Sequence, residues 1–313
     1  MIRNRYLATT LAALLLTAAA GAWNKAGHMV SGAIAYHVLK ADHPETVANV
    51  VALLGQHPDY DRHWRGRLEA SYVESEERDL YLFMLAARWA DDARDDARHY
   101  PAGENRDRWH YVNLPVRVPA RFPATPPDSN NIMRAFATNS ARVRELAASP
   151  ADRAVALTWI FHLVGDVHQP LHVASLFSAR FPSGDRGGNR FYIRVREDRA
   201  AINLHQFWDD LIIGTDRFQN TRNLAIELRL RPDFQRPKLT ELAETSFDLW
   251  ASRESFALAV NEAYRDGTLV GGTSRSDAPV LPEDYPSRAK SAAERRIILA
   301  GYRLAAVLHE LMH

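Results

Sequence analysis

The sequence is organised around the stretch His162-Leu-Val-Gly-Asp166-Val-His168-Gln-Pro170-Leu-His172, which follows the apolar run AVALTWIF at residues 154–161. The apolar run predicts a buried helix, on which His162 and Asp166, four residues apart, share one face. Pro170 lacks a backbone donor and ends the helix, so we expect His172 to follow from an irregular segment. Three candidate ligands within eleven residues predict a metal site, and this stretch alone indicates one ion.

The first 22 residues predict a cleaved secretory signal. A basic start, Met1-Ile-Arg3-Asn-Arg5, precedes an apolar run from residue 7 to residue 20, and an Ala-x-Ala site ends at Ala22. This arrangement is typical of a signal peptide rather than a membrane span, although an anchor that stays attached is the alternative. We therefore expect an exported protein, periplasmic or secreted, cleaved between Ala22 and Trp23 and not inserted in a membrane.

Composition narrows the class of protein. The chain contains no Cys, so an exported protein of this sequence has no disulfides and depends on packing and bound metal. The formal net charge is +1 and becomes about −1 when the two signal arginines are removed, which excludes a broad electrostatic clamp for duplex DNA. Residues 23–313 suffice for one large domain with a substantial core.

Periodicity predicts an all-α (mainly α) single domain with a small β-hairpin. Residues 191–196 alternate as a strand that can pair with residues 201–204, and residues 115–127 predict a proline-rich loop. Asp128-Ser129 is a plausible cap for a helix ending at residue 148, and Ser149-Pro150 for the helix that carries His162. The other expected helices are residues 23–40, 44–54, 76–96, 204–211, 238–264 and 288–313.

Four further motifs extend the candidate site. The motif His205-Gln-Phe-Trp-Asp209 repeats the spacing of His162 and Asp166, and imidazole and carboxylate ligands without thiolate suit catalytic zinc. The second motif is Trp89-Ala-Asp91-Asp92-Ala-Arg94, for which an ordinary acidic helix turn is the alternative. The third is Trp109-His110-Tyr111-Val-Asn113, for which a core histidine is the alternative. In the last, Trp23-Asn-Lys-Ala-Gly-His28, an α-amine freed at Trp23 would be the ligand.

This set of motifs, with Gly187-Gly188-Asn189, resembles the zinc-dependent single-strand-specific nucleases and 3′-nucleotidases of the S1/P1 type, in the family's order over nearly the whole mature chain. The resemblance implies a mainly helical domain related to the phospholipase C fold, with three zinc ions as cofactors. The implied ligands are Asp91, His110, His162 and Asp166 for the first ion, and His172, His205 and Asp209 for the second. The third would take the amine and carbonyl of Trp23 and His28, and would share Asp166.

The resemblance also implies an activity. The expected reaction is hydrolysis of single-stranded RNA and DNA to 5′-phosphate products, by a hydroxide that bridges two zinc ions, with 3′-nucleotidase activity on 3′-nucleotides. Fungal members have a carboxylate where this chain has Asn113, which leaves base preference open. No stable protein partner is implied, and we expect a monomer. The implied catalytic residues are Asp91, Arg94 and Asp166, and the implied substrate-binding residues are Tyr111, Asn113, Gly188 and Asn189.

Two other functions fit parts of the pattern. A zinc-dependent phospholipase C would use the same ligands, but Tyr111 and the Gly187-Gly188-Asn189 loop favour a nucleobase. A non-catalytic exported zinc-binding protein would leave Arg94 and Tyr111 without a role. The remaining histidines match no position of the pattern and are predicted to be structural or exposed: His37, His43, His57, His63, His99, His168, His309 and His313.

Overall fold

The structure is a computed structural model that describes residues 23–94, 96–100 and 106–313, so the predicted signal lies outside the described residues. The fold is mainly α-helical, as the periodicity predicts. None of the described helices combines the length and the apolar character that crossing a membrane requires. The longer helices are α1 (Lys25–Asp42), α2 (Pro44–Leu54), α4 (Arg78–Asp92), α5 (Ile132–Arg144), α6 (Pro150–Asp166), α8 (Phe218–Leu230) and α11 (Tyr285–Met312).

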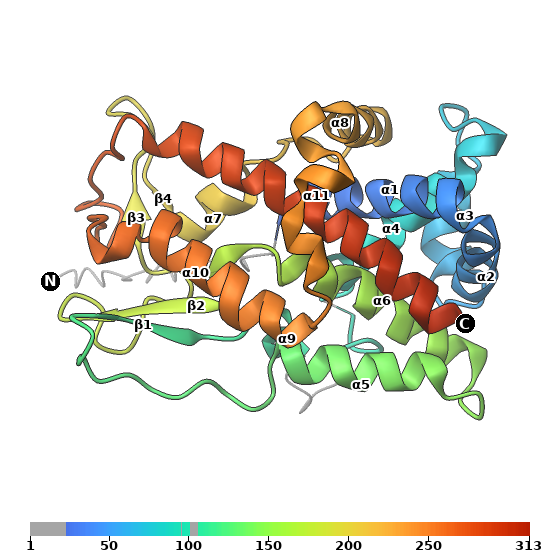
Figure 1. Cartoon of the computed structure of the whole chain (residues 1–313), viewed down its shortest axis with the longest axis horizontal. Coiled ribbons are helices and arrows are strands. Elements are labelled where there is room, and N and C mark those ends of the chain that lie inside the picture. The colour runs from blue at the N-terminus through green and yellow to red at the C-terminus, as the bar shows by residue number, and fades with distance from the viewer. Residues whose placement is uncertain (1–22, 95, 101–105) are drawn as a thin grey trace, which may run out of the picture.

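Helix α1 lies at the centre of the core. Most of its residues are buried, and α4, α6, α8 and α11 pack around it. Figure 1 shows α11 running across the face of the bundle, with its end beside α2. Asn24 caps α1 by accepting a hydrogen bond from the Gly27 N–H. The predicted helix at residues 23–40 is therefore confirmed, displaced by two residues.

Helix α6 carries the stretch from which the sequence was first interpreted. The Ser149 side chain accepts from the Asp152 N–H and Pro150 occupies the first turn, as predicted. From residue 156 to Asp166 every residue is buried. The helix ends at Asp166, before Pro170, and a short 3₁₀ turn, Pro170–His172, presents His172. The helix thus ends before the stop expected at Pro170, and the proline instead begins the turn that presents His172.

The strands differ from the prediction. Residues 114–118, expected to lie mostly in a proline-rich loop, form β1 (Leu114–Val118), which pairs in parallel with β2 (Ala174–Ser178). A proline is tolerated there because every second N–H of a strand in a two-stranded sheet points away from its partner. The expected hairpin is confirmed in shorter form, as the antiparallel pair β3 (Tyr192–Ile193) and β4 (Ile202–Asn203).

Several helix boundaries also need correction. Helix α5 is capped by Asn131, which accepts from two N–H groups of the first turn, and not by Asp128-Ser129. The single helix expected over residues 238–264 is divided into 3₁₀ turns and a helical segment from Phe247 that contains two π-helical stretches, at residues 250–255 and 259–263. The short helices α3 (Arg65–Leu68), α7 (Leu204–Asp209), α9 (Phe247–Leu249) and α10 (Phe256–Leu258) complete the described fold.

Gly301 allows α11 to approach α1 closely, and this contact can be tested. A Cβ at position 301 would lie 2.3 Å from the Cγ2 atom of Ile34. We expect Gly301→Ala to lower the free energy of unfolding by about 1–3 kcal/mol, because overpacking outweighs the helix preference of alanine. The matched control is Gly66→Ala in α3, where nothing lies within 4 Å of the added Cβ. Urea unfolding at fixed metal concentration measures both; equal stabilities would contradict the close packing.

Candidate metal centre

Four helices and two short turns bring together five histidines and three aspartates in the interior. Each has a nearly inaccessible side chain, and each is a side-chain ligand that the sequence predicts. They form three groups, in each of which the donor atoms lie within 4.8 Å of one another. The groups are His28, His162 and Asp166; Asp91, His110 and His162; and His172, His205 and Asp209.

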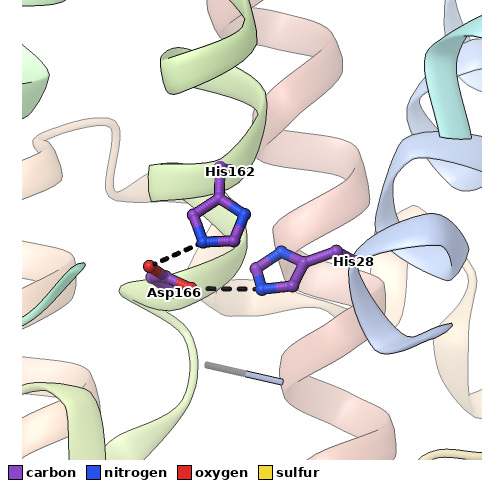
Figure 2. A group of neighbouring side chains, drawn as sticks. All are labelled: His28, His162 and Asp166. Atoms are coloured by element: carbon purple, nitrogen blue, oxygen red, sulfur yellow. Dashed lines mark ion pairs between the residues drawn. The ribbon is translucent and has the colours of Figure 1, made fainter. Parts of the chain in front are cut away.

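Asp166 connects the first two groups. Its Oδ1 lies 3.2 Å from the Nε2 of His28, and its Oδ2 lies 3.2 Å from the Nε2 of His162 and 3.0 Å from the Nδ1 of His110. Figure 2 shows His28 reaching from α1 and His162 from α6 toward this carboxylate. Gly165 makes room for His28, because a Cβ there would lie 2.6 Å from the His28 Nδ1. The two oxygens of one carboxylate therefore face two different groups.

The third group lies beside α7. The Nε2 atoms of His172 and His205 are 3.1 Å apart, and the His205 Nε2 lies 3.6 Å from the Asp209 Oδ2. The buried Gln169 donates to the other oxygen of Asp209, at 2.7 Å. The spacing of four residues between His205 and Asp209 thus places both side chains on one face of a helix, as it does in α6.

Hydrogen bonds outside the groups fix which ring nitrogen faces inward. The Nδ1 atoms of His162, His172 and His205 lie 2.9, 2.6 and 2.6 Å from the carbonyl oxygens of Ala87, His110 and Gly187. A carbonyl only accepts, so each Nδ1 carries the proton and each Nε2 presents a lone pair. Backbone carbonyls orient metal-ligating histidines in this way.

His110 is oriented through its other ring nitrogen, Nε2. Its Nε2 lies 3.0 Å from the hydroxyl of Tyr100, and that hydroxyl donates to the Ala90 carbonyl at 2.9 Å. The hydroxyl proton is thereby used, so the Nε2 of His110 is the donor and its Nδ1 presents the inward lone pair. Tyr100 is therefore a positioning residue for a candidate ligand.

These orientations make the centre suited to cations. The inward nitrogens of His162 and His110 are 2.9 Å apart, and those of His172 and His205 are 3.1 Å apart; two lone pairs at such distances repel unless a proton or a metal ion lies between them. Burial lowers the pKa of His110 and of His205 to about 3, so both rings are neutral at pH 7.

The carboxylates lead to the same conclusion. Burial raises the pKa of Asp209 well above its usual range, so a cation beside it would be stabilising. Asp91 Oδ1, Asp166 Oδ1 and both ring nitrogens of His28 are buried and make no well-formed hydrogen bond in the described structure; Asp91 Oδ1 has ion pairs with Arg94 and His162, and Asp166 Oδ1 has one with His28. Burial by itself lowers the pKa of His162, but the charges of Asp166 and Asp91 outweigh it and raise that pKa overall. A proton can therefore occupy the metal-free centre until a metal ion displaces it. The donor set fits zinc, which binds imidazole and carboxylate.

Comparison with known proteins identifies the family. Residues 23–313 match the S1/P1 Nuclease family. The chain belongs to the S1/P1 nuclease family. This is a family of nucleases, and it is metal-dependent.

Individual relatives agree with this placement. The chain is 24% identical to Endonuclease 1 of Arabidopsis thaliana, over 92% of this chain and 87% of that protein. It is 33% identical to Endonuclease 4 of the same plant, over 50% of each chain, and 26% identical to Nuclease S1 of Aspergillus oryzae, over 49% of this chain and 53% of that protein. For the last two relatives, the chain spans about half of their length.

The other residues that the family resemblance implies lie around the three groups. The Nη2 of Arg94 is 3.1 Å from Asp91 Oδ1. Tyr111 and Asn113 are half-buried and continue the chain from His110, where the Val112 N–H donates to the His172 carbonyl at 2.8 Å. The segment with Tyr111 thus lies between the second and third groups.

The glycine loop has a structural task that the sequence interpretation missed. The Gly187 carbonyl orients His205, and Gly187 has φ 61°, with a Cβ position only 2.3 Å from the Leu171 carbonyl oxygen. Gly188 packs against the His205 backbone, and the Asn189 amide donates to the Arg186 carbonyl at 2.9 Å. Only glycine fits this approach of backbone to backbone.

Trp23 is buried beside the metal centre. Its indole N–H donates to the Gly165 carbonyl at 3.1 Å, and the adjacent Asn24 N–H donates to the Asp209 carbonyl at 3.3 Å. These contacts place the residue beside the ends of both α6 and α7. The predicted amine ligand depends on cleavage after Ala22, which lies outside the described residues.

Gln169 offers a test of the third group. Gln169→Ala removes the hydrogen bond that orients Asp209, and we expect the metal affinity of this group to fall by about 10–100-fold, as for other orienting partners of ligands. The control is Gln206→Ala, which changes an exposed side chain on the same helix as Asp209. Competition with a chromophoric chelator measures zinc affinity. Equal affinities in the two variants would contradict the orienting role.

Proposed function

We propose that the chain hydrolyses phosphodiester bonds in single-stranded RNA and DNA, and removes the 3′-phosphate from 3′-nucleotides. Cleavage of the bond between phosphorus and the 3′-oxygen would leave a 5′-phosphate on one product and a 3′-hydroxyl on the other. One observation carries the proposal: three groups of imidazoles and carboxylates direct their donor atoms to a shared interior in a chain of the S1/P1 nuclease family.

Three zinc ions fit the three groups. Asp91, His110, His162 and Asp166 would hold one ion, and His172, His205 and Asp209 another. His28 with the amine and carbonyl of Trp23 would hold the third, together with Asp166. Zinc supplies Lewis-acid chemistry, in which it polarises phosphoryl oxygens and makes water acidic enough to be a nucleophile near neutral pH.

Arg94 would bind the phosphate. Its guanidinium lies 3.1 Å from Asp91 in the second group, and its side chain is 16% exposed, so it can reach a ligand at the edge of the centre. A guanidinium presents several N–H donors in the plane that matches phosphate oxygens. It would therefore orient the scissile phosphate and stabilise charge on its non-bridging oxygens during the reaction.

Tyr111 would select single strands. Its ring follows His110 directly and is half-buried, and a tyrosine ring can stack on any base. A base in a duplex must leave its stack to reach such a ring, which costs a few kcal/mol. Asn113 and Asn189, which both donate and accept, would contact the edge of the same base.

Export of the protein belongs to the same proposal. Cleavage between Ala22 and Trp23 would deliver a domain of residues 23–313 to the periplasm or the medium and free the Trp23 amine. The buried position of Trp23 beside Gly165 supports a ligand role for that amine.

Chelation tests the function. We expect the processed chain to cut single-stranded DNA and RNA, to cut a matched duplex at least tenfold more slowly, and to lose activity on complete zinc removal. Denaturing gels with 5′-labelled and 3′-labelled oligonucleotides measure both the rate and the product ends. Zinc should restore activity, with magnesium as the control. Activity that survives full demetallation, or release of diacylglycerol from phosphatidylcholine without cleavage of poly(A), would overturn the proposal.

The amine ligand has its own test. A chain with one extra residue before Trp23 should contain one zinc fewer and lose most of its turnover, because the new peptide bond removes the amine. The control is the same chain treated with an aminopeptidase that removes the added residue. Elemental analysis counts the zinc, and full zinc content in the extended chain would contradict the ligand role of Trp23.

A further inference from the structure

A second cluster of imidazoles lies at the opposite end of α1 from the metal centre. His43 follows the end of α1 and precedes α2, Glu45 lies in the first turn of α2, and His309 and His313 end α11. We name these four residues the terminal histidine cluster. Figure 1 shows the end of α11 beside α2. Fifteen residues of helix separate His43 from His28, roughly 22 Å at 1.5 Å per residue, so the cluster is separate from the candidate catalytic groups.

The donors of this cluster converge. One donor atom each from His43, Glu45 and His309 lies within 4.8 Å of the other two. The His43 Nδ1 is 3.6 Å from a Glu45 oxygen, and the His43 and His309 rings stack with centroids 3.8 Å apart. Ligands of a tetrahedral zinc ion with bonds of about 2.0–2.1 Å lie roughly 3.3 Å apart. The side chains of His43 and Glu45 are 43% and 55% exposed, so they have room for the rotation needed.

His313 lies next to the three converging donors and offers a further imidazole. It is four residues from His309 and therefore on the same face of α11. The two rings have centroids 4.6 Å apart, and the His313 Nε2 lies 3.9 Å from the Glu45 carboxylate. Three imidazoles and one carboxylate form a donor set that suits zinc and does not suit magnesium or calcium.

A buried hydroxyl orients the rings. The Oγ1 of Thr46, which is fully buried, lies 2.9 Å from the His309 Nδ1 and 3.1 Å from the His313 Nε2. A hydroxyl has one proton, so it donates to one ring and must accept from the other. The Nε2 of His309 is thereby left for another partner. An oriented histidine with one nitrogen held by the protein is the arrangement that metal ligands have.

The surroundings of His309 favour its neutral, ligand form. Slight burial, and then the neighbouring His43 and His313, lower the pKa of His309. Groups facing the cluster from both helices are imidazoles, the Thr46 hydroxyl and the Glu45 carboxylate. A divalent cation would be bound here once the His43 ring turns out of its stack with His309 and directs a nitrogen toward the same point.

We propose that His43, Glu45 and His309, with His313 as the fourth donor, form a zinc site that ties the end of α11 to the start of α2. An ion that binds the folded chain and not the unfolded chain stabilises the fold by mass action. This inference is independent of the nuclease reaction. It also changes the prediction that these histidines are merely structural or exposed.

The test counts metal in a chain purified without a polyhistidine tag and equilibrated with micromolar free zinc. We expect His43→Ala and His309→Ala each to contain one zinc equivalent fewer than the unaltered chain, with zinc-dependent activity on a single-stranded oligonucleotide unchanged. The control is His63→Ala. His63 has a 53% exposed side chain and a carboxylate at 3.9 Å, but lies outside the cluster.

Thermal unfolding provides a second readout. A first rise in the midpoint temperature of unfolding is expected when zinc fills the catalytic groups. Further zinc should then raise this temperature by a few more degrees, and His43→Ala should abolish that second rise. The milder His43→Gln should do the same if the alanine variant folds poorly. Equal zinc content in the unaltered chain and in both alanine variants, or an undiminished second rise in the His43 variants, would overturn the proposal and leave the cluster a stack of imidazoles.

Discussion

The repulsion between inward-facing imidazole nitrogens is the constraint on which the centre depends. In water, two such nitrogens would separate or bind a proton, but here each ring is held from behind by a carbonyl or a hydroxyl. Because the groups are buried, solvent cannot relieve the contact. The fold therefore holds imidazole and carboxylate donors at fixed positions, which is the preorganisation that a metal-dependent enzyme requires.

The core supplies this rigidity. Helix α1 brings His28 to Asp166 only because it packs closely on its neighbours, and α4 provides both Asp91 and the Ala87 carbonyl that orients His162. A side chain on α6 is thus positioned by the backbone of α4. Packing between helices and orientation of ligands are two effects of the same contacts, so a change in one displaces the other.

The sequence predicted which side chains gather in the centre better than it predicted what orients them. The spacing of four residues in His162/Asp166 and His205/Asp209 follows from the helical repeat, and every predicted side-chain ligand lies in one of the three groups. The orienting partners were not predictable in this way. Tyr100 and the carbonyls of Ala87 and Gly187 come from other segments, and backbone carbonyls leave no mark in the sequence. Gln169 stands in the opening stretch, yet only its distance to Asp209 reveals its task.

The parallel pair of β1 and β2 shows why such partners escape local patterns. Leu114 pairs with Ala174, so the ladder starts just beyond His110 on one strand and just beyond His172 on the other. The Val112 N–H donates to the His172 carbonyl, and the His110 carbonyl accepts from the His172 ring. The pairing therefore places the second and third groups side by side. A one-residue shift in register would turn the side chains to the opposite face. The short strand β1, despite its proline, therefore sets how the second and third groups lie relative to each other.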